Sequence, residues 1–299
     1  MPDFFRIAIA FALVALNTMV HGTTLLLLAL LKLLLPIMAV RDALTRVLVR
    51  IAESWMAVNT LMIRRLTPTR IELHTEANLQ YEGWYLVLCN HASWVDIPVL
   101  QAVTNRRIPA LKFFLKRELI FVPILGLAWW ALDFPFMKRH SRAEIEKNPA
   151  LRGQDLEAAR RACARYLKLP VSVMNFVEGT RFTEAKRQQQ GSPYDHLLKP
   201  RAGGVAAVLD AMGASLRSVL DVTVVYPGDK PPTMLDLLAG RIGKIEAHIV
   251  ERPIPDLGTG DYESDAGYRE RCQEWINGLW AQKDALIAAR RAARIEPQA

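Results

Sequence analysis

The first forty residues carry the longest hydrophobic stretches of the chain. Residues 4–20 are almost continuously apolar, and residues 25–40 resume the pattern after the interruption His21-Gly22-Thr23-Thr24. As a helix, each run of roughly 16–18 residues would extend about 25 Å, slightly less than the hydrocarbon core of a bilayer. The pattern predicts two apolar helices folded into a hairpin, with the turn at residues 21–24.

Three interpretations compete for this segment. A cleaved signal peptide is disfavoured because no small-residue cleavage site closes the first run and a second apolar run follows at once. The others are a buried helix pair and a membrane-embedded hairpin, which is favoured and either crosses the bilayer or enters one leaflet. The arginines that follow, with few acids among them, place the rest of the chain on the cytoplasmic side: Arg41, Arg46, Arg50, Arg64, Arg65 and Arg70.

Residues 43–66 carry apolar side chains at near-helical spacing. Two interpretations remain open for this helix: packing on the core of the domain, or lying at the membrane interface with its arginines toward lipid headgroups. We therefore expect residues 1–66 to form a membrane-embedded helical hairpin with an interfacial helix. Residues 67–299 are expected to form one α/β domain.

From residue 70 onward, short β-rich runs alternate with helical patterns, which indicates a sheet covered by helices. The polar, turn-rich residues 184–198 predict a flexible loop, and residues 262–294 predict a terminal helix or helix pair. The expected strands are residues 71–75, 84–89, 171–176, 221–226 and 245–250. The expected helices are residues 98–103, 117–132, 155–167, 203–212 and 234–238.

Composition narrows the class of protein. The chain has 299 residues, 51% of them hydrophobic, which excludes a disordered chain. Its three cysteines cannot pair completely, which argues against a disulfide scaffold and agrees with a reducing compartment. The net charge of +8 raises nucleic acid as a partner, but no basic–aromatic recognition motif is present. Basic charge beside a long apolar segment favours an anionic membrane surface instead.

The segment Asn90-His91-Ala92-Ser93-Trp94-Val95-Asp96 follows the strand predicted at residues 84–89. On a continuous helix His91 and Asp96 would lie about 140° apart, so they can meet only where the chain turns, as between a strand and a helix. There Asp96 could accept from one imidazole nitrogen and leave the other free as a base. The alternative is structural: Ser93 and Asp96 form a capping box, and His91 is an ordinary loop residue.

A second polar segment, Glu178-Gly179-Thr180-Arg181, follows the strand predicted at residues 171–176. Glycine permits tight backbone geometry, arginine offers a planar fork for phosphate, and Glu178 can hold the arginine or a substrate hydroxyl. The segment indicates an anion pocket; the alternative is a β-turn with a surface arginine. Lys199-Pro200-Arg201 could likewise contact a phosphate, although a solvated basic turn is favoured.

Together the two segments resemble the glycerolipid acyltransferase family. Its N-H-x-S-x-x-D block is complete here, and its F-P-E-G-T-R block occurs at residues 176–181 with valine in place of proline. The block with valine resembles that of a subgroup containing 1-acylglycerol-3-phosphate and lysophospholipid acyltransferases. The resemblance covers residues 70–250, with further matches at Lys116-Arg117-Glu118-Leu119, Phe136-Met137-Lys138-Arg139 and Val224-Val225-Tyr226-Pro227. Asp133 stands where a glycine is common.

The resemblance implies a fold and a reaction. The fold is a glycerol-3-phosphate acyltransferase-like mixed sheet covered by helices, preceded here by the apolar hairpin. His91 would take the proton from the sn-2 hydroxyl of 1-acylglycerol-3-phosphate, whose oxygen attacks an acyl thioester, giving phosphatidic acid, while Asp96 orients His91. Acyl-CoA or acyl-ACP is the implied co-substrate, with no other cofactor. Membrane lipids are the implied partners, and the bacterial inner membrane, with the catalytic domain on its cytoplasmic side, is the implied location.

The same resemblance implies a set of substrate-binding residues. Arg139 and Arg181 would hold the acceptor phosphate, with Lys116 as a further candidate. Ser93 is not expected to be a nucleophile because no G-x-S-x-G elbow surrounds it. The complete set is Asn90, Ser93, Lys116, Arg139, Glu178, Gly179, Thr180 and Arg181.

Other functions remain open from the sequence. The acceptor could be another lysophospholipid or lipid, and a His–Asp pair could also serve a lipid hydrolase. A non-catalytic membrane-binding protein would need only the basic, apolar surface. No metal site is expected, because the remaining histidines are scattered and lack a metal-binding spacing: His21, His74, His140, His196 and His248.

Overall fold

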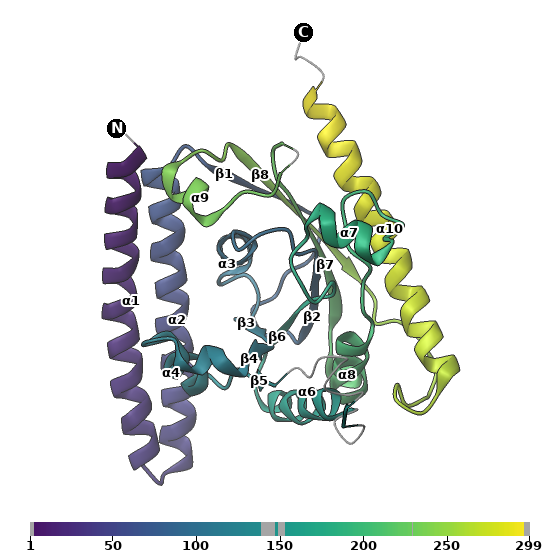
Figure 1. Ribbon diagram of the computed structural model, residues 1–299. Helices are drawn as coiled ribbons and strands as arrows, with labels where there is room; N and C mark the ends of the chain where they lie inside the picture. The colour runs from purple at the N-terminus through teal and green to yellow at the C-terminus, as the bar shows by residue number, and fades with distance from the viewer. Residues whose placement is uncertain (1–2, 139–146, 149–152, 229, 296–299) are drawn as a thin grey trace.

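Two long antiparallel helices lie along one side of an α/β body in this computed structural model (Figure 1), which describes residues 3–138, 147–148, 153–228 and 230–295. The helices are α1 (Asp3–Leu34) and α2 (Met38–Leu66). A third long helix, α10 (Ala266–Ile295), lies on the opposite side of the body. The hairpin ends at Leu66, and the first strand of the body begins at Arg70.

The turn of the hairpin lies at residues 35–37, between α1 and α2, so the prediction of a turn at residues 21–24 is wrong. Pro36 occupies the turn, where its ring and missing N–H do not allow a helix to continue. The predicted interruption lies inside α1 instead. Residues 43–66, for which a core helix and an interfacial helix were open, form most of the second arm.

Packing explains why the polar residues at 21–24 do not break α1. A Cβ atom on Gly22 would come within 2.2 Å of Ile124 Cγ2, so this glycine allows a close approach between α1 and the body. His21 has one ring nitrogen 3.1 Å from the carbonyl oxygen of Asn17 and the other 3.1 Å from Ser54 Oγ on α2. The side chains of His21 and Thr24 are therefore hydrogen-bonded within the hairpin.

A six-stranded mixed sheet forms the centre of the body, in the order β1-β8-β7-β2-β6-β3. The neighbouring strands are parallel except for the pair β7 and β8. This confirms the mixed sheet and all five predicted strands: β1 (Arg70–Thr75), β2 (Tyr85–Cys89), β6 (Ser172–Phe176), β7 (Ser218–Val225) and β8 (Lys244–Arg252). The unpredicted strands are short: β3 (Leu111–Phe113), β4 (Leu115–Lys116) and β5 (Phe136–Met137).

Two of the predicted elements differ from the structure. The helix expected at residues 117–132 is divided around Pro123 into η1 (Arg117–Phe121) and α4 (Leu125–Ala131). The loop expected at residues 184–198 contains α7 (Glu184–Gln190), which Thr183 caps by accepting from the backbone N–H of Lys186. The other expected helices are confirmed: α3 (Asp96–Thr104), α6 (Gln154–Arg165), α8 (Gly203–Met212), α9 (Met234–Ala239) and α10, a single helix.

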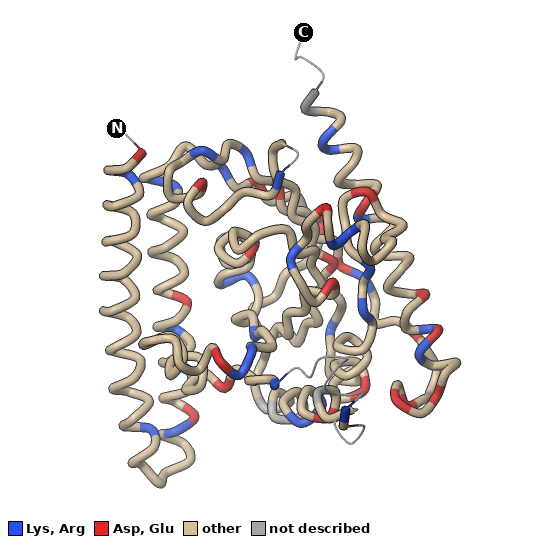
Figure 2. The backbone as a smooth tube through the Cα atoms, in the orientation of Figure 1, with Lys and Arg blue, Asp and Glu red and all other residues tan. Residues whose placement is uncertain are grey.

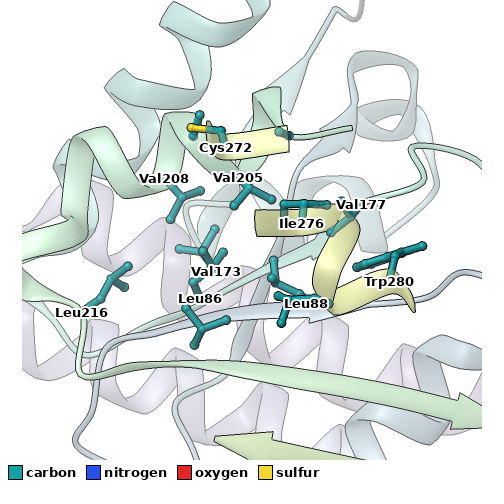
Figure 3. Packing of buried hydrophobic residues seen from close by; sticks show 14 of the residues in the cluster. Leu86, Leu88, Val173, Val177, Val205, Val208, Leu216, Cys272, Ile276 and Trp280 are labelled. Carbon is teal, nitrogen blue, oxygen red and sulfur yellow. The ribbon is translucent and has the colours of Figure 1, made fainter. Parts of the chain in front are cut away.

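Helices cover both faces of the sheet. On one face, Val205 and Val208 of α8 and Ile276 and Trp280 of α10 pack against apolar side chains of β2 and β6 (Figure 3). On the other, Tyr85, Val87 and Cys89 of β2 join a second cluster that includes Val99 and Leu100 of α3. Successive side chains of a strand point to opposite faces, so all five residues of β2 are buried and the strand is apolar throughout. The three cysteines are buried and unpaired.

The surface of α1 differs from that of the body. Its charged residues, Asp3, Arg6 and Lys32, lie near its two ends, and the helix between them carries no charge (Figure 2). It is long and apolar enough to cross a membrane, and only 22% of its most apolar 18-residue stretch is buried. The large apolar side chains exposed on it include Phe4, Phe5, Phe11, Leu16, Met19, Leu27, Leu30 and Leu34.

Candidate active site

The two predicted site segments meet at the carboxyl ends of neighbouring parallel strands. β2 and β6 are paired, with Cys89 opposite Phe176, so the loops that follow them leave the same edge of the sheet. Two hydrogen bonds join the loops: Phe182 N–H donates to the carbonyl oxygen of His91 at 2.7 Å, and His91 N–H donates to Glu178 Oε1 at 2.9 Å. The edge of the sheet therefore brings together residues far apart in sequence.

His91 and Asp96 form a hydrogen-bonded pair. Nδ1 of His91 lies 2.8 Å from Oδ2 of Asp96, the first residue of α3. The same carboxylate oxygen accepts from the backbone N–H groups of Ala92 at 2.8 Å and Ser93 at 2.9 Å. A carboxylate acceptor places a proton on Nδ1, which leaves Nε2 with a lone pair available as a base. Asp96 is fully buried, whereas the His91 side chain keeps 14% exposure.

Half of the capping box considered for Ser93 and Asp96 is present. The Asp96 carboxylate accepts from Ser93 N–H, but Ser93 Oγ accepts from Val95 N–H at 3.0 Å and donates to the carbonyl oxygen of Pro232 at 2.5 Å. The turn and the His–Asp pair are thus one arrangement, in which the carboxylate both closes the turn and binds the imidazole. Ser93 is buried and its hydroxyl is used within the loop.

Tyr226 is a site residue that the sequence did not assign. Its hydroxyl donates to Oδ1 of Asp96 at 2.6 Å, so both carboxylate oxygens of Asp96 are bonded. Burial, together with the negative charge of Asp96, raises the pKa of Tyr226 well above its usual value and keeps it a donor. Its signal in the sequence was its place in Val224-Val225-Tyr226-Pro227, directly after an apolar strand.

Asn90 and Phe176 support the strand end that carries His91 in different ways. Asn90 Nδ2 donates to the carbonyl oxygen of Val224 at 3.0 Å, and its Oδ1 accepts from Val224 N–H at 2.9 Å. This side chain ties the end of β2 to β7. Phe176 stacks on the imidazole of His91, with ring centroids 3.9 Å apart and an interplanar angle of 15°. The stacking contact fixes the imidazole, whereas Asn90 fixes the backbone at the residue before His91; the role of Phe176 was not anticipated.

Glu178 is directed into the protein. Its carboxyl group accepts from His91 N–H and, at 3.0 Å, from Leu198 N–H, and only 1% of the residue is exposed. Burial raises the pKa of Glu178 to about 8, although the two N–H donors act in the opposite direction. Glu178 therefore links the two loops to the segment at residue 198.

Arg181 lies over the ring of Trp94, with its guanidinium carbon 4.7 Å from the ring centroid. Gly179 has φ +70°, a conformation that favours glycine, and a Cβ built there would lie 3.7 Å from Arg201 Cδ. Thr180 Oγ1 accepts from Lys186 Nζ at 2.8 Å. The second segment is thus a tight turn with two arginine side chains beside it.

A cleft of about 1620 Å³ joins these residues to the helical hairpin. Its lining includes His91, Trp94, Lys116, Arg181 and Arg201. It also includes residues of α1 and α2, among them Phe11, Leu25, Trp55, Met56 and Met62. Polar groups suited to a phosphate and apolar groups suited to hydrocarbon therefore share one cavity. Arg139, the other predicted phosphate-binding arginine, lies outside the described residues.

Asp133, noted where a glycine is common, has φ +60°. Left-handed backbone favours glycine, so the family preference has a conformational reason at this position. Tyr166 OH donates to its carbonyl oxygen at 2.7 Å and helps to hold that geometry.

The remaining histidines were expected to be scattered, and for two of them this is wrong. His74 and His248 are paired in the register of β1 and β8, with Glu246 beside them. Among the described residues, this is the one group of three or more possible metal ligands that lie close together. It does not include His91 or Asp96.

Comparisons with known proteins agree with the fold. The family described as Acyltransferase matches residues 70–227, which is more than half of the chain and contains both site segments. The chain belongs to this acyltransferase family.

Individual relatives share this family. The chain is 27% identical to mouse 1-acyl-sn-glycerol-3-phosphate acyltransferase gamma, over 81% of the chain and 63% of the relative. It is 27% identical to 1-acyl-sn-glycerol-3-phosphate acyltransferase 2 of Arabidopsis thaliana, over 71% of the chain and 53% of the relative. The alignments therefore span little more than half the length of these curated relatives.

A solved structure extends the likeness to the hairpin and the terminal helix. The 1-acyl-sn-glycerophosphate (LPA) acyltransferase PlsC from Thermotoga maritima is similar with a TM-score of 0.56 and 15% identity, covering 93% of this chain and 96% of that one. At this identity the likeness concerns the fold, and it confirms the expected fold class.

Proposed function

We propose that this protein transfers a fatty acyl group from an acyl thioester to the sn-2 hydroxyl of 1-acylglycerol-3-phosphate, giving phosphatidic acid. The observation that carries the proposal is the His91–Asp96 pair in a cleft that is also lined by the hairpin. The names of the relatives support the acceptor, since they are 1-acyl-sn-glycerol-3-phosphate acyltransferases. The donor, acyl-CoA or acyl-ACP, is proposed from the family resemblance.

In the proposed reaction His91 Nε2 takes the proton of the acceptor hydroxyl. The hydroxyl oxygen forms a bond to the thioester carbonyl carbon, and the carbon–sulfur bond then breaks. His91 returns its proton to the departing thiolate, so the histidine ends as it began. Asp96 stabilises the imidazolium that forms in between, and a positioned base of this kind contributes on the order of 10²–10⁴ in rate.

Arg181 is the proposed partner of the acceptor phosphate. Its guanidinium lines the cleft with His91, and stacking on Trp94 leaves its N–H edge able to form a bidentate contact. Lys116 and Arg201 line the same cleft and add positive charge. The proposed role of Glu178 and Asn90 is to hold the loops that carry these groups, because their side chains are bonded within the protein.

The hairpin is proposed to embed in a membrane and to deliver lipid to the cleft. Its support is the uncharged, mostly exposed surface of α1, together with Phe121, Leu127 and Trp130 of η1 and α4, which are also exposed. Phe121 is the most exposed of the three at 83%. An apolar surface of this extent requires an apolar environment. The inner membrane of a bacterium, with the body on its cytoplasmic side, remains the proposed location.

The test combines the full-length protein in membranes, 1-acylglycerol-3-phosphate and a labelled acyl thioester. We expect labelled phosphatidic acid from the wild-type protein and none above background from His91→Ala. His196→Ala, which changes a histidine bonded to Arg291 on α10, should retain activity. Labelled free fatty acid as the sole product would indicate a hydrolase, and full activity of folded, membrane-bound His91→Ala would exclude the mechanism.

A further inference from the structure

A second polar cluster lies on the sheet, formed by the parallel strands β1 and β8. Their register places Glu72 opposite Glu246 and His74 opposite His248. Residues two apart on a strand share a face, so these four side chains form a square on one face of the sheet. The opposite face carries Ile71, Leu73, Ile245 and Ala247, which pack in the core.

Potential ligand atoms converge within this cluster. One ligand atom each from His74, Glu246 and His248 lies within 4.8 Å of the others. His248 Nε2 is 3.2 Å from Glu246 Oε2, and the two imidazoles are stacked with centroids 4.5 Å apart. Glu72 is the next carboxylate, with Oε2 at 3.7 Å from His74 Nε2.

His74 supplies a second, independent observation. Its Nε2 atom is buried and has no hydrogen-bond partner, although the side chain as a whole is partly exposed. Buried polar groups nearly always have a partner, and each exception needs an explanation such as an ion. Glu246 and His248, the other members of the group, are themselves buried.

We propose that His74, Glu246 and His248 bind a divalent transition-metal ion, with Glu72 completing its surroundings. Two imidazoles and a carboxylate are the ligands that Zn²⁺ prefers, and the same set suits Co²⁺ and Ni²⁺. Carboxylates alone would favour Ca²⁺ or Mg²⁺, so the two histidines decide the class of metal.

The cations already present can make way for the metal. Lys244 Nζ lies 2.8 Å from Glu72 Oε2 and 3.5 Å from Glu246 Oε1, and Arg290 Nε of α10 lies 3.6 Å from Glu246 Oε2, so the metal would replace these two cations. Their side chains are 47% and 42% exposed, so each can turn toward water. The metal would then join β1, which directly follows the hairpin, to β8 in the body.

The test uses purified full-length protein in detergent, stripped of metal with a chelator and then dialysed. Zn²⁺ is titrated in competition with a chromophoric chelator, and Co²⁺ binding is followed by its visible ligand-field absorption. We expect one equivalent of Zn²⁺ with a dissociation constant below about 10 µM, as two imidazoles and a carboxylate on a preformed sheet can give. Co²⁺ should give bands that Zn²⁺ removes.

His74→Gln and His248→Gln should each weaken Zn²⁺ binding at least tenfold and abolish the Co²⁺ bands. His74→Gln is the safer variant because His74 is partly exposed, and its melting temperature without metal shows whether it is folded. His196→Gln and His91→Gln are the matched controls and should bind as the wild type does. Absence of Zn²⁺ binding by the wild type, or binding that survives both His74→Gln and His248→Gln, would overturn the proposal.

Discussion

The site at the ends of β2 and β6 and the hairpin of α1 and α2 satisfy opposite requirements. At the site, the side-chain oxygens of Asn90, Asp96 and Glu178 are buried and bonded within the protein. On α1, large apolar side chains such as Phe11 and Leu27 are 67% and 63% exposed. The site therefore encloses its polar groups, whereas α1 exposes its apolar side chains.

The difference agrees with the proposed role of each region. A base needs a fixed position and a fixed tautomer, which supporting groups bonded inside the fold provide. A surface in contact with lipid is apolar, as is the exposed face of α1. Inside the hairpin, polar contacts join the helices, as where Asn17 Nδ2 donates to Asn59 Oδ1 at 2.8 Å.

The largest effect is expected from Asp96→Asn. An amide can present its NH₂ group to Nδ1 of His91 and favour the wrong tautomer, so kcat should fall by about 10³–10⁴ with folding retained. Steady-state acyl transfer in membranes measures it. Asp195→Asn, at an aspartate that is 86% exposed, is the control and should be unchanged. A loss of less than tenfold would remove Asp96 from the proposed mechanism.

The next effect concerns the hairpin. Phe11→Asp with Leu27→Asp should release the protein from phospholipid vesicles, because aspartate at the centre of a membrane helix costs about 3 kcal/mol per residue. Vesicle flotation measures the bound fraction and hence the partition coefficient. We expect the partition coefficient to fall at least a hundredfold. The control is Gln188→Asp with Gln189→Asp on α7, two exposed positions on the body. Equal flotation of the two variants would contradict membrane binding through α1.

A smaller effect is expected from Tyr226→Phe, which removes one hydrogen bond to Asp96 and keeps the buried ring. A hydrogen bond to a charged group is worth about 1.5–3 kcal/mol, so kcat should fall about 10- to 150-fold, with KM little changed. Tyr81→Phe is the matched control, because Tyr81 also donates to a carboxylate, that of Glu53 on α2. A loss of activity in Tyr226→Phe through KM alone would argue that Tyr226 does not position Asp96.

The smallest effect is on stability. The raised pKa of Glu178, about 8, means that the folded protein holds a proton that the unfolded chain releases near its ordinary pKa. The retained proton stabilises the folded protein. This stabilisation is complete at pH values below the ordinary pKa of a glutamate and is lost as the pH rises through about 8, so the free energy of unfolding should decline over that interval. Glu178→Gln should flatten the decline in denaturant unfolding at pH 5 and pH 8. Glu184→Gln, at an exposed carboxylate, should keep the wild-type slope; equal slopes for all three proteins would contradict the assignment.

Contacts between residues near one another in sequence were predicted well. His91 and Asp96 were expected to meet across a strand-to-helix turn, and they do, because the turn is local and the carboxylate itself helps to close it. The alternation of strands and helices predicted five strands and most helices for the same reason. The turn at residues 21–24 was predicted wrongly because Gly22 reflects a contact with Ile124, about a hundred positions away, which local pattern does not reveal.

The sequence by itself determined the α/β class, the apolar segment, the His–Asp pair and the acyltransferase resemblance, because hydrophobic periodicity and short motifs act over a few residues. Only the tertiary structure decided that Tyr226 supports Asp96, that Phe176 stacks on His91 and that His74 meets His248. These contacts depend on which strands are neighbours and in what register, and both are set by packing of the whole sheet. The sequence supplied the chemical groups, and the sheet order β1-β8-β7-β2-β6-β3 brought them within bonding distance.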